Sequence, residues 1–126
     1  MRLLLDTHSL LWFLAGHPRL SRKARRIAEN PRNAVYASAV SGYELAYKRM
    51  RGLLDFEIVD QLAQFIRGAN LAELPVTMAH TIAAGELPGS HRDPWDRILV
   101  AQARIESLTL VTTDPMLQFY GVPTLW

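Results

Sequence analysis

The first seven residues constrain the fold more than any other stretch of this 126-residue chain. A run of three leucines (Leu3–Leu5) ends abruptly at Asp6 and Thr7. A short apolar run of this kind predicts a strand over residues 2–6 that is buried on both faces, as at the centre of a parallel sheet. Ligands of open α/β sheets collect beyond the carboxyl ends of such strands. The sequence therefore places Asp6 in a candidate site.

The rest of the chain alternates between extended and helical patterns. Further strands are predicted over residues 34–37, 71–76, 108–112 and 122–125. Helices are predicted to begin at Thr7 or Ser9, at Ser21, at Ser41, near Phe56, at Thr77, at Asp93 and at Asp114. This alternation predicts a single α/β domain over residues 1–126, with a parallel sheet of about five strands and helices on both faces.

The composition excludes several classes of protein. Apolar residues make up 49% of the chain, which is typical of a globular domain. There is no cysteine, so disulfides, thiolate metal ligands and cysteine nucleophiles are excluded together. No apolar run approaches the ~20 residues of a membrane span, and the N-terminus lacks the pattern of a signal peptide. We therefore expect a cytoplasmic protein that does not contact a membrane.

Three later acidic residues stand where a helix is expected to begin: Glu44, Asp96 and Asp114. Each has a structural explanation. Ser41 and Glu44 have the spacing of a capping box, and Asp93 and Asp114 both precede a proline, as helix caps often do. Asp6 has no such explanation at this stage, because it ends an apolar strand, where a lone carboxylate is costly to bury.

Taken together, these carboxylates are expected to converge beside Asp6. Their mutual repulsion calls for a cation, and ligation by oxygen alone favours Mg²⁺ or Mn²⁺. Such an ion can activate water and neutralise charge on a phosphoryl group. Without the ion, at least one carboxyl pKa should be raised, because like charges disfavour the second ionisation. The four histidines show no ligand spacing.

Basic and aromatic residues suggest contacts with RNA. Two basic clusters could meet phosphates, and the residues assigned to this role are Arg22, Arg25, Arg26, Lys48 and Arg49. For either cluster alone, a solvated helix face is the alternative. Exposed aromatic side chains could also stack on unpaired bases, and the candidates are Trp12, Tyr43, Tyr47 and Trp95. Core packing is the alternative for these residues and is favoured for Trp12.

Four segments resemble the PIN domain family, in particular the VapC-type toxins of bacterial toxin–antitoxin pairs. They are Leu4–His8, Ser38–Ala46, His91–Ala103 and Leu108–Asp114. Their order and spacing cover nearly the whole chain. The resemblance implies a three-layer α/β/α PIN-like fold and Mg²⁺- or Mn²⁺-dependent endoribonuclease activity. It also implies a homodimer and inhibition by a cognate VapB-type antitoxin.

The resemblance also assigns roles to residues. The positions that match the family's catalytic and metal-binding acids are Asp6, Glu44, Asp96 and Asp114. Asp93 lies one turn before Asp96, where it is either a cap or a source of outer-shell charge. Thr7 and Thr113 are further outer-shell candidates, since each could hydrogen-bond a carboxylate or a water.

Two partner surfaces follow from these expectations. The antitoxin is expected to cross apolar side chains of the early helices, at Leu10, Leu11 and Leu14 or at Leu45 and Tyr47. The dimer is expected to use the later helices near Trp95 and Leu99.

Two other functions stay open at this stage. One is an RNA-binding module of the same fold that does not cleave. The other is a receiver-type signalling domain, which would need an acidic pair after the first strand and a late lysine. Here Asp6 is followed by Thr7, and no lysine occurs after Met50, so the sequence lacks both features that a receiver-type signalling domain would need.

Overall fold

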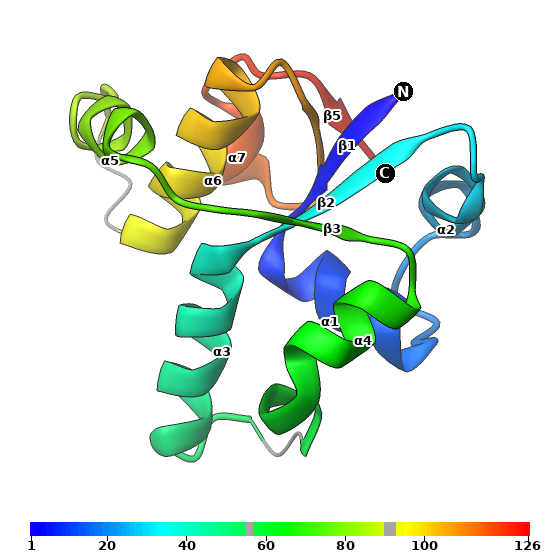
Figure 1. Ribbon diagram of the computed structural model, residues 1–126. Coiled ribbons are helices and arrows are strands. Elements are labelled where there is room, and N and C mark those ends of the chain that lie inside the picture. Colours follow the sequence, from blue (N-terminus) through cyan, green and yellow to red (C-terminus); the bar gives the residue numbers. More distant parts are fainter. Residues whose placement is uncertain (55–56, 90–92) are drawn as a thin grey trace.

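A single parallel sheet organises the computed structural model, which describes residues 1–54, 57–89 and 93–126. The strands are β1 (Arg2–Leu5), β2 (Ala34–Ser38), β3 (Ala72–Leu74), β4 (Thr109–Val111) and β5 (Thr124–Leu125). Their order in the sheet is β3-β2-β1-β4-β5, and each neighbouring pair is parallel. Leu5 lies opposite Ala37 of β2 and Val111 of β4, so the carboxyl ends of three strands meet at one edge (Figure 1). The predicted five-stranded parallel sheet is confirmed.

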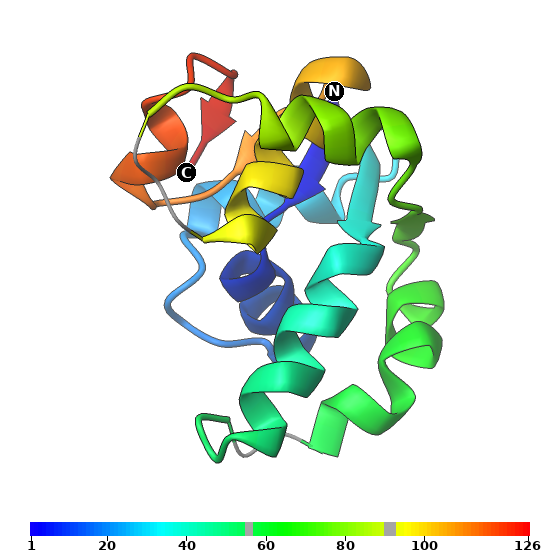
Figure 2. The ribbon, with the colours of Figure 1, turned by 90° about the vertical axis from the view of Figure 1, so that its left-hand side faces the viewer.

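Helices cover both faces of this sheet (Figures 1 and 2). One face carries α1 (Thr7–Ala15), α2 (Arg22–Glu29) and α4 (Leu62–Gly68), and the other carries α5 (Met78–Gly85), α6 (Pro94–Ile105) and α7 (Pro115–Gln118). Helix α3 (Ala39–Met50) continues from the end of β2 and extends away from the sheet, beside the 3₁₀ helix η1 (Glu57–Gln61) and α4. The three-layer α/β/α prediction is therefore confirmed.

Two details of the helices bear on the predictions. The expected start of the fourth helix near Phe56 lies outside the described residues, and the part that follows is divided into η1 and α4. Across the residues that the structure describes, none of the helices combines the length and the apolar character that crossing a membrane requires.

The leucine run of β1 forms the centre of the core. Leu3 and Leu5 point into the apolar layer under α1, α2 and α4, whereas Leu4 points into the layer under α6, where it joins Leu99. Successive side chains of a strand face opposite sides of the sheet, which explains this division. All three leucines are fully buried, so the prediction of a strand buried on both faces is confirmed.

Helix α1 begins without a loop after β1, and Asp6 is its cap. The Asp6 carboxylate accepts a hydrogen bond from the backbone N–H of Ser9 at 2.8 Å. The prediction that Thr7 or Ser9 caps this helix is therefore wrong, and so is the inference that Asp6 has no capping role. The strand turns directly into the helix at Asp6, which makes its side chain the first acceptor within reach of the free N–H groups.

Helix α3 begins three residues earlier than the sequence predicted. Ser38 ends β2, and its hydroxyl accepts a hydrogen bond from the N–H of Val40 at 3.1 Å, so Ser38 is the cap. The predicted capping box of Ser41 and Glu44 is wrong, because both residues lie inside the helix. Their spacing of three residues places them on one helix face instead.

Part of the predicted antitoxin surface is not at the surface. Leu10, Leu11 and Leu45 are buried, because α1 and the start of α3 pack against the sheet and against each other. The prediction is wrong for these three residues. Leu99 is also fully buried and takes no part in an exposed dimer face.

Candidate active site

Thr7 links the start of α1 to the acidic residue of α3. Its hydroxyl donates a hydrogen bond to Oε1 of Glu44 at 2.7 Å and lies 2.9 Å from the hydroxyl of Ser41. All three side chains are buried. Ser41 and Glu44 are one turn apart on α3, so both face Thr7. A buried polar network therefore joins α1 and α3 beside the carboxyl end of β1.

The second carboxylate oxygen of Glu44 meets a cation of the same helix. Nζ of Lys48 lies 2.5 Å from Oε2 of Glu44, one helical turn further on. Glu44 is only 3% exposed, whereas the Lys48 side chain is 24% exposed. A buried carboxylate is costly unless it is paired and hydrogen-bonded. Glu44 satisfies both conditions through Thr7 and Lys48.

Asp6 lies at the same edge and is also buried, at 7% exposure. Burial raises the pKa of its carboxyl above the ordinary value of 3.8, and hydrogen bonds from Thr112 and Ser9 oppose that rise. The sequence led us to expect a raised pKa, but from repulsion between like charges. The main cause is instead the loss of water around Asp6, which penalises its charged form.

The raised pKa of Asp6 predicts a pH-dependent effect of Asp6→Asn on stability in the metal-free protein. The folded state binds the Asp6 proton more tightly than the unfolded chain does. Ionisation therefore lowers the free energy of unfolding as pH rises through the folded pKa. Asparagine retains the cap and cannot ionise. We expect Asp6→Asn to have the higher Tm at pH 7, and the difference to vanish at pH values below 3.8. Thermal unfolding of both proteins across this pH range, in chelator, measures it; a lower Tm for the variant at pH 7 would contradict it.

Asp114 follows Thr112 and Thr113 after the end of β4, the strand that pairs with β1. Its carboxylate caps α7 by accepting from the N–H of Met116 at 2.9 Å, and its own N–H donates to the hydroxyl of Thr112 at 3.0 Å. The Thr112 side chain also hydrogen-bonds Asp6. One buried threonine therefore connects the backbone of Asp114 with the carboxylate of Asp6.

Asp96 lies in the first turn of α6, and Asp93 caps that helix. The Asp93 carboxylate accepts from the N–H groups of Trp95 at 3.0 Å and Asp96 at 3.3 Å. The Trp95 ring lies 6.0 Å from Nζ of Lys48. The start of α6 therefore faces the part of α3 that carries Lys48, the ion-pair partner of Glu44.

The four predicted carboxylates do not form one compact cluster in this conformation. Within residues 1–54, 57–89 and 93–126, no three acidic or histidine side chains are grouped closely enough to hold a metal ion. Asp6 and Glu44 are both buried at this edge, where Thr7 follows Asp6 and hydrogen-bonds Glu44, whereas Asp96 lies in the first turn of α6 and Asp114 caps α7. Mg²⁺ often binds through one or two carboxylates and keeps several waters. The donors present are therefore suited to a hard cation, and ligation by all four acids stays a prediction.

The predicted RNA-binding residues differ in their surroundings. Arg22 and Arg26 are exposed on α2. Arg25 donates hydrogen bonds to the backbone carbonyls of Trp12 at 3.0 Å and His17 at 3.3 Å, so it secures the end of α1. For the α3 pair, Lys48 contacts Glu44, and Arg49 forms an ion pair with Asp60 at 2.8 Å. Thr113, the other outer-shell candidate, is exposed.

Three hydroxyl-bearing residues have roles at the site that the sequence did not predict. Ser9 and Thr112 hydrogen-bond Asp6, and Ser41 contacts Thr7. A signal was present for Thr112, which follows β4 directly and so reaches the same sheet edge as Asp6. The role of Ser41 depended on the true start of α3, which the sequence pattern misplaced.

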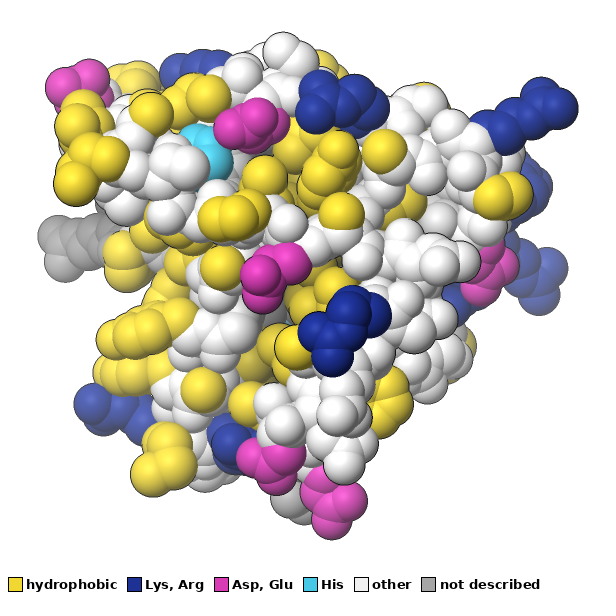
Figure 3. Space-filling view, viewed as in Figure 1, with side chains coloured by type: hydrophobic (Ala, Val, Ile, Leu, Met, Phe, Trp, Pro, Cys, Tyr) yellow, Lys and Arg dark blue, Asp and Glu magenta, His cyan; other side chains and the backbone are white. Residues whose placement is uncertain are grey.

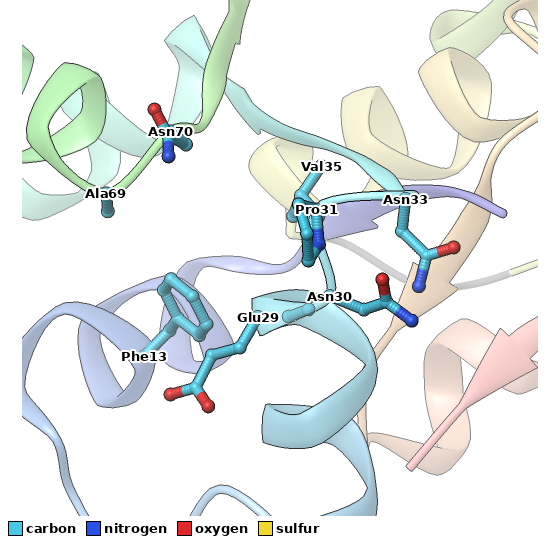
Figure 4. Close-up of a pocket in the computed structure, with 9 residues that line it drawn as sticks. Phe13, Glu29, Asn30, Pro31, Asn33, Val35, Ala69 and Asn70 are labelled. Atoms are coloured by element: carbon cyan, nitrogen blue, oxygen red, sulfur yellow. The ribbon is translucent and has the colours of Figure 1, made fainter.

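Two hollows lie away from the buried acids. A cavity of about 430 Å³ lies at the amino end of β2, with Phe13 and Glu29 on one side and Ala69 and Asn70 on another (Figure 4). A groove of about 310 Å³ runs between α3 and α4, and hydrophobic side chains are visible along it (Figure 3). Its lining includes Gly42, Ala46, Leu62, Ala63 and Ile66.

Comparisons with known proteins agree with this architecture. A family model described as the PIN domain matches residues 3–122. A chain in the crystal structure of VapBC2 from Rickettsia felis, bound to a DNA fragment from their promoter, has a TM-score of 0.69 and 20% identity and covers 100% of this chain and 98% of that one. A chain in the DNA-bound VapBC of Salmonella typhimurium has a TM-score of 0.69 and 18% identity, covering 99% and 97%.

A third similar structure is FitAcB from Neisseria gonorrhoeae, with a TM-score of 0.64 and 21% identity over 98% of this chain and 96% of that one. At such low identities, the three likenesses concern the fold. The comparison with curated protein sequences found no match.

Proposed function

The chain belongs to the PIN domain family, and we propose that it is a Mg²⁺- or Mn²⁺-dependent endoribonuclease, the toxin of a toxin–antitoxin pair. One observation carries the proposal. A buried aspartate, Asp6, ends the central strand of a parallel sheet, and a second buried acid, Glu44, is held at the same edge by Thr7. Ligand sites of such sheets lie at this edge, and two carboxylates there can hold a hard cation.

The chain's own residues have separate roles in this proposal. The acids that hold the metal are Asp6, Glu44, Asp96 and Asp114. The bound ion would activate a water and neutralise charge on the phosphodiester. Thr7 orients Glu44, Thr112 orients Asp6, and Asp93 fixes the start of α6, which carries Asp96. We assign the binding of RNA phosphates to Arg22 and Arg26, which are exposed on α2.

A cleavage assay tests the activity. The purified protein is incubated with total cellular RNA, with and without Mn²⁺, and the new RNA ends are mapped by sequencing. We expect cuts at defined positions that require Mn²⁺ and disappear in chelator. RNA that is bound but never cut would favour the non-cleaving RNA-binding module instead.

The partner proposal is an antitoxin segment lying in the groove between α3 and α4. Two of the similar structures are DNA-bound VapBC complexes. In this chain the groove has an apolar lining that includes Leu62 and Ile66, and Glu73 is the acidic residue that lines it. A segment with apolar side chains and a basic residue would complement it.

A homodimer is also part of the proposal, through an aromatic surface that we define as Tyr43, Tyr47 and Trp95. Tyr43 is 61% exposed, and the three rings lie within 6.2 Å of one another, centre to centre. A hollow of about 530 Å³ adjoins Tyr43 and Trp95 and is also lined by Val76 and Ile98. Exposed aromatic clusters beside an apolar hollow are typical of protein interfaces.

A further inference from the structure

Lys48 forms an ion pair with the carboxylate of Glu44, which is a metal ligand in the proposed function. Oε1 of Glu44 accepts from Thr7 at 2.7 Å, and Oε2 lies 2.5 Å from Nζ of Lys48. Both oxygens of this buried side chain therefore already have partners within the chain. A divalent cation that binds Oε2 would meet the positive charge of the ammonium group at that oxygen.

The surroundings of Lys48 allow its ammonium group to move away from the carboxylate of Glu44. Its side chain is partly exposed, in contrast to that of Glu44, so the ammonium group lies at the boundary between the site and solvent. Lysine carries a point charge on a flexible four-carbon stem, which can reorient without moving the helix. The Trp95 ring, with its centroid 6.0 Å from Nζ, is a second, cation–π partner of the same ammonium group.

We propose that Lys48 is a tethered counter-ion that neutralises Glu44 in the metal-free protein and competes with the divalent cation for it. This inference rests on the proposed function, in which Glu44 is a metal ligand. The lysine stabilises an otherwise unpaired buried carboxylate. Because it is attached one turn away on the same helix, it is present at a fixed and high local concentration. Lys48 thereby lowers the metal affinity of the site.

The test is the affinity for Mn²⁺, measured by titration calorimetry and by the electron paramagnetic resonance signal of free Mn²⁺. Lys48→Met keeps the stem and removes the charge. We expect it to tighten Mn²⁺ binding about 5- to 30-fold, the factor that one to two kcal/mol produces. Arg51→Met is the matched control, because it removes a positive charge at the end of the same helix, where Arg51 contacts the Tyr47 ring. Its Mn²⁺ affinity should equal that of the unmodified protein.

A second pair of variants shows whether the effect passes through Glu44. In a Glu44→Gln background, adding Lys48→Met should leave Mn²⁺ affinity unchanged. Thermal unfolding gives an independent readout: Mn²⁺ should raise the Tm of Lys48→Met more than that of the unmodified protein. If Lys48→Met does not fold, Lys48→Gln, which can still hydrogen-bond Glu44, takes its place and should tighten Mn²⁺ binding in the same direction.

The possible failures are distinguishable. If Glu44→Gln weakens Mn²⁺ binding but Lys48→Met leaves it unchanged or weakens it, the tethered counter-ion is overturned and the metal role of Glu44 stands. If Glu44→Gln leaves Mn²⁺ affinity unchanged, Glu44 is not a ligand, and that part of the proposed function fails together with this inference.

Discussion

Replacing Asp6 by asparagine is expected to abolish RNA cleavage while the protein stays folded. Asparagine caps a helix about as well as aspartate, so the hydrogen bond from the Ser9 N–H to this side chain is retained. The change removes the negative charge that a cation requires. Loss of groups that merely support a metal ligand costs about 10- to 100-fold in activity or metal affinity, so we expect the loss of the ligand itself to exceed about 100-fold.

Asp93→Asn is the matched control for this prediction. Asp93 also caps a helix through backbone N–H groups, and asparagine keeps that cap as well. We expect it to retain cleavage of the same RNA, measured as the rate of appearance of mapped ends at saturating Mn²⁺. Circular dichroism shows whether each variant is folded. Equal losses of cleavage activity from Asp6→Asn and Asp93→Asn would contradict the different roles expected for the two residues. They would indicate that Asp93 takes a direct part in cleavage.

The sheet could be predicted from the sequence because each buried strand has a simple local signal. The leucine run of β1 is apolar at every position, as a strand covered on both faces must be, and its burial is complete. Asp6 was recognised as a site residue because its charge interrupts that run. Its capping role was missed, because Asp6, Thr7 and Ser9 can all cap a helix, and only the backbone direction after Leu5 selects among them.

The start of α3 shows where local patterns fail. Ser41 and Glu44 have the spacing of a capping box, but the same spacing also places two residues on one face inside a helix. The strand register decides between the two readings: β2 ends at Ser38, and the helix begins at once. The strand register cannot be predicted from the sequence of this segment alone, because it depends on how β2 pairs with the neighbouring strands.

The burial of Glu44 could not be predicted either, because it depends on a contact between two helices. Glutamate followed four residues later by lysine is a common pair on exposed helices. Here the glutamate is buried, because α1 covers this face of α3 through Thr7. The spacing of Glu44 and Lys48 is that of an ordinary surface pair, and only the contact between α1 and α3 shows that Glu44 is buried.

Expression of this chain alone is expected to arrest the growth of a bacterial host, and expression beside its cognate antitoxin is expected to restore growth. An enzyme that cuts cellular RNA must be restrained, and the site offers a physical means of restraint. A guanidinium group of an antitoxin can pair with buried carboxylates through two parallel hydrogen bonds and exclude the metal. Asp6→Asn should be harmless, because it retains the fold and the groove between α3 and α4 but lacks the catalytic charge.

Growth curves after induction measure this effect, and the amount of each protein is compared by immunoblot, so that harmlessness is not mistaken for poor expression. The antitoxin candidate is the reading frame next to this gene. If the unmodified protein is made in full and cuts RNA in vitro, yet growth continues, the nuclease assignment stands and the toxin assignment fails. If both the unmodified protein and Asp6→Asn arrest growth equally, the arrest comes from binding, since the variant retains the surfaces but not the charge at the end of β1.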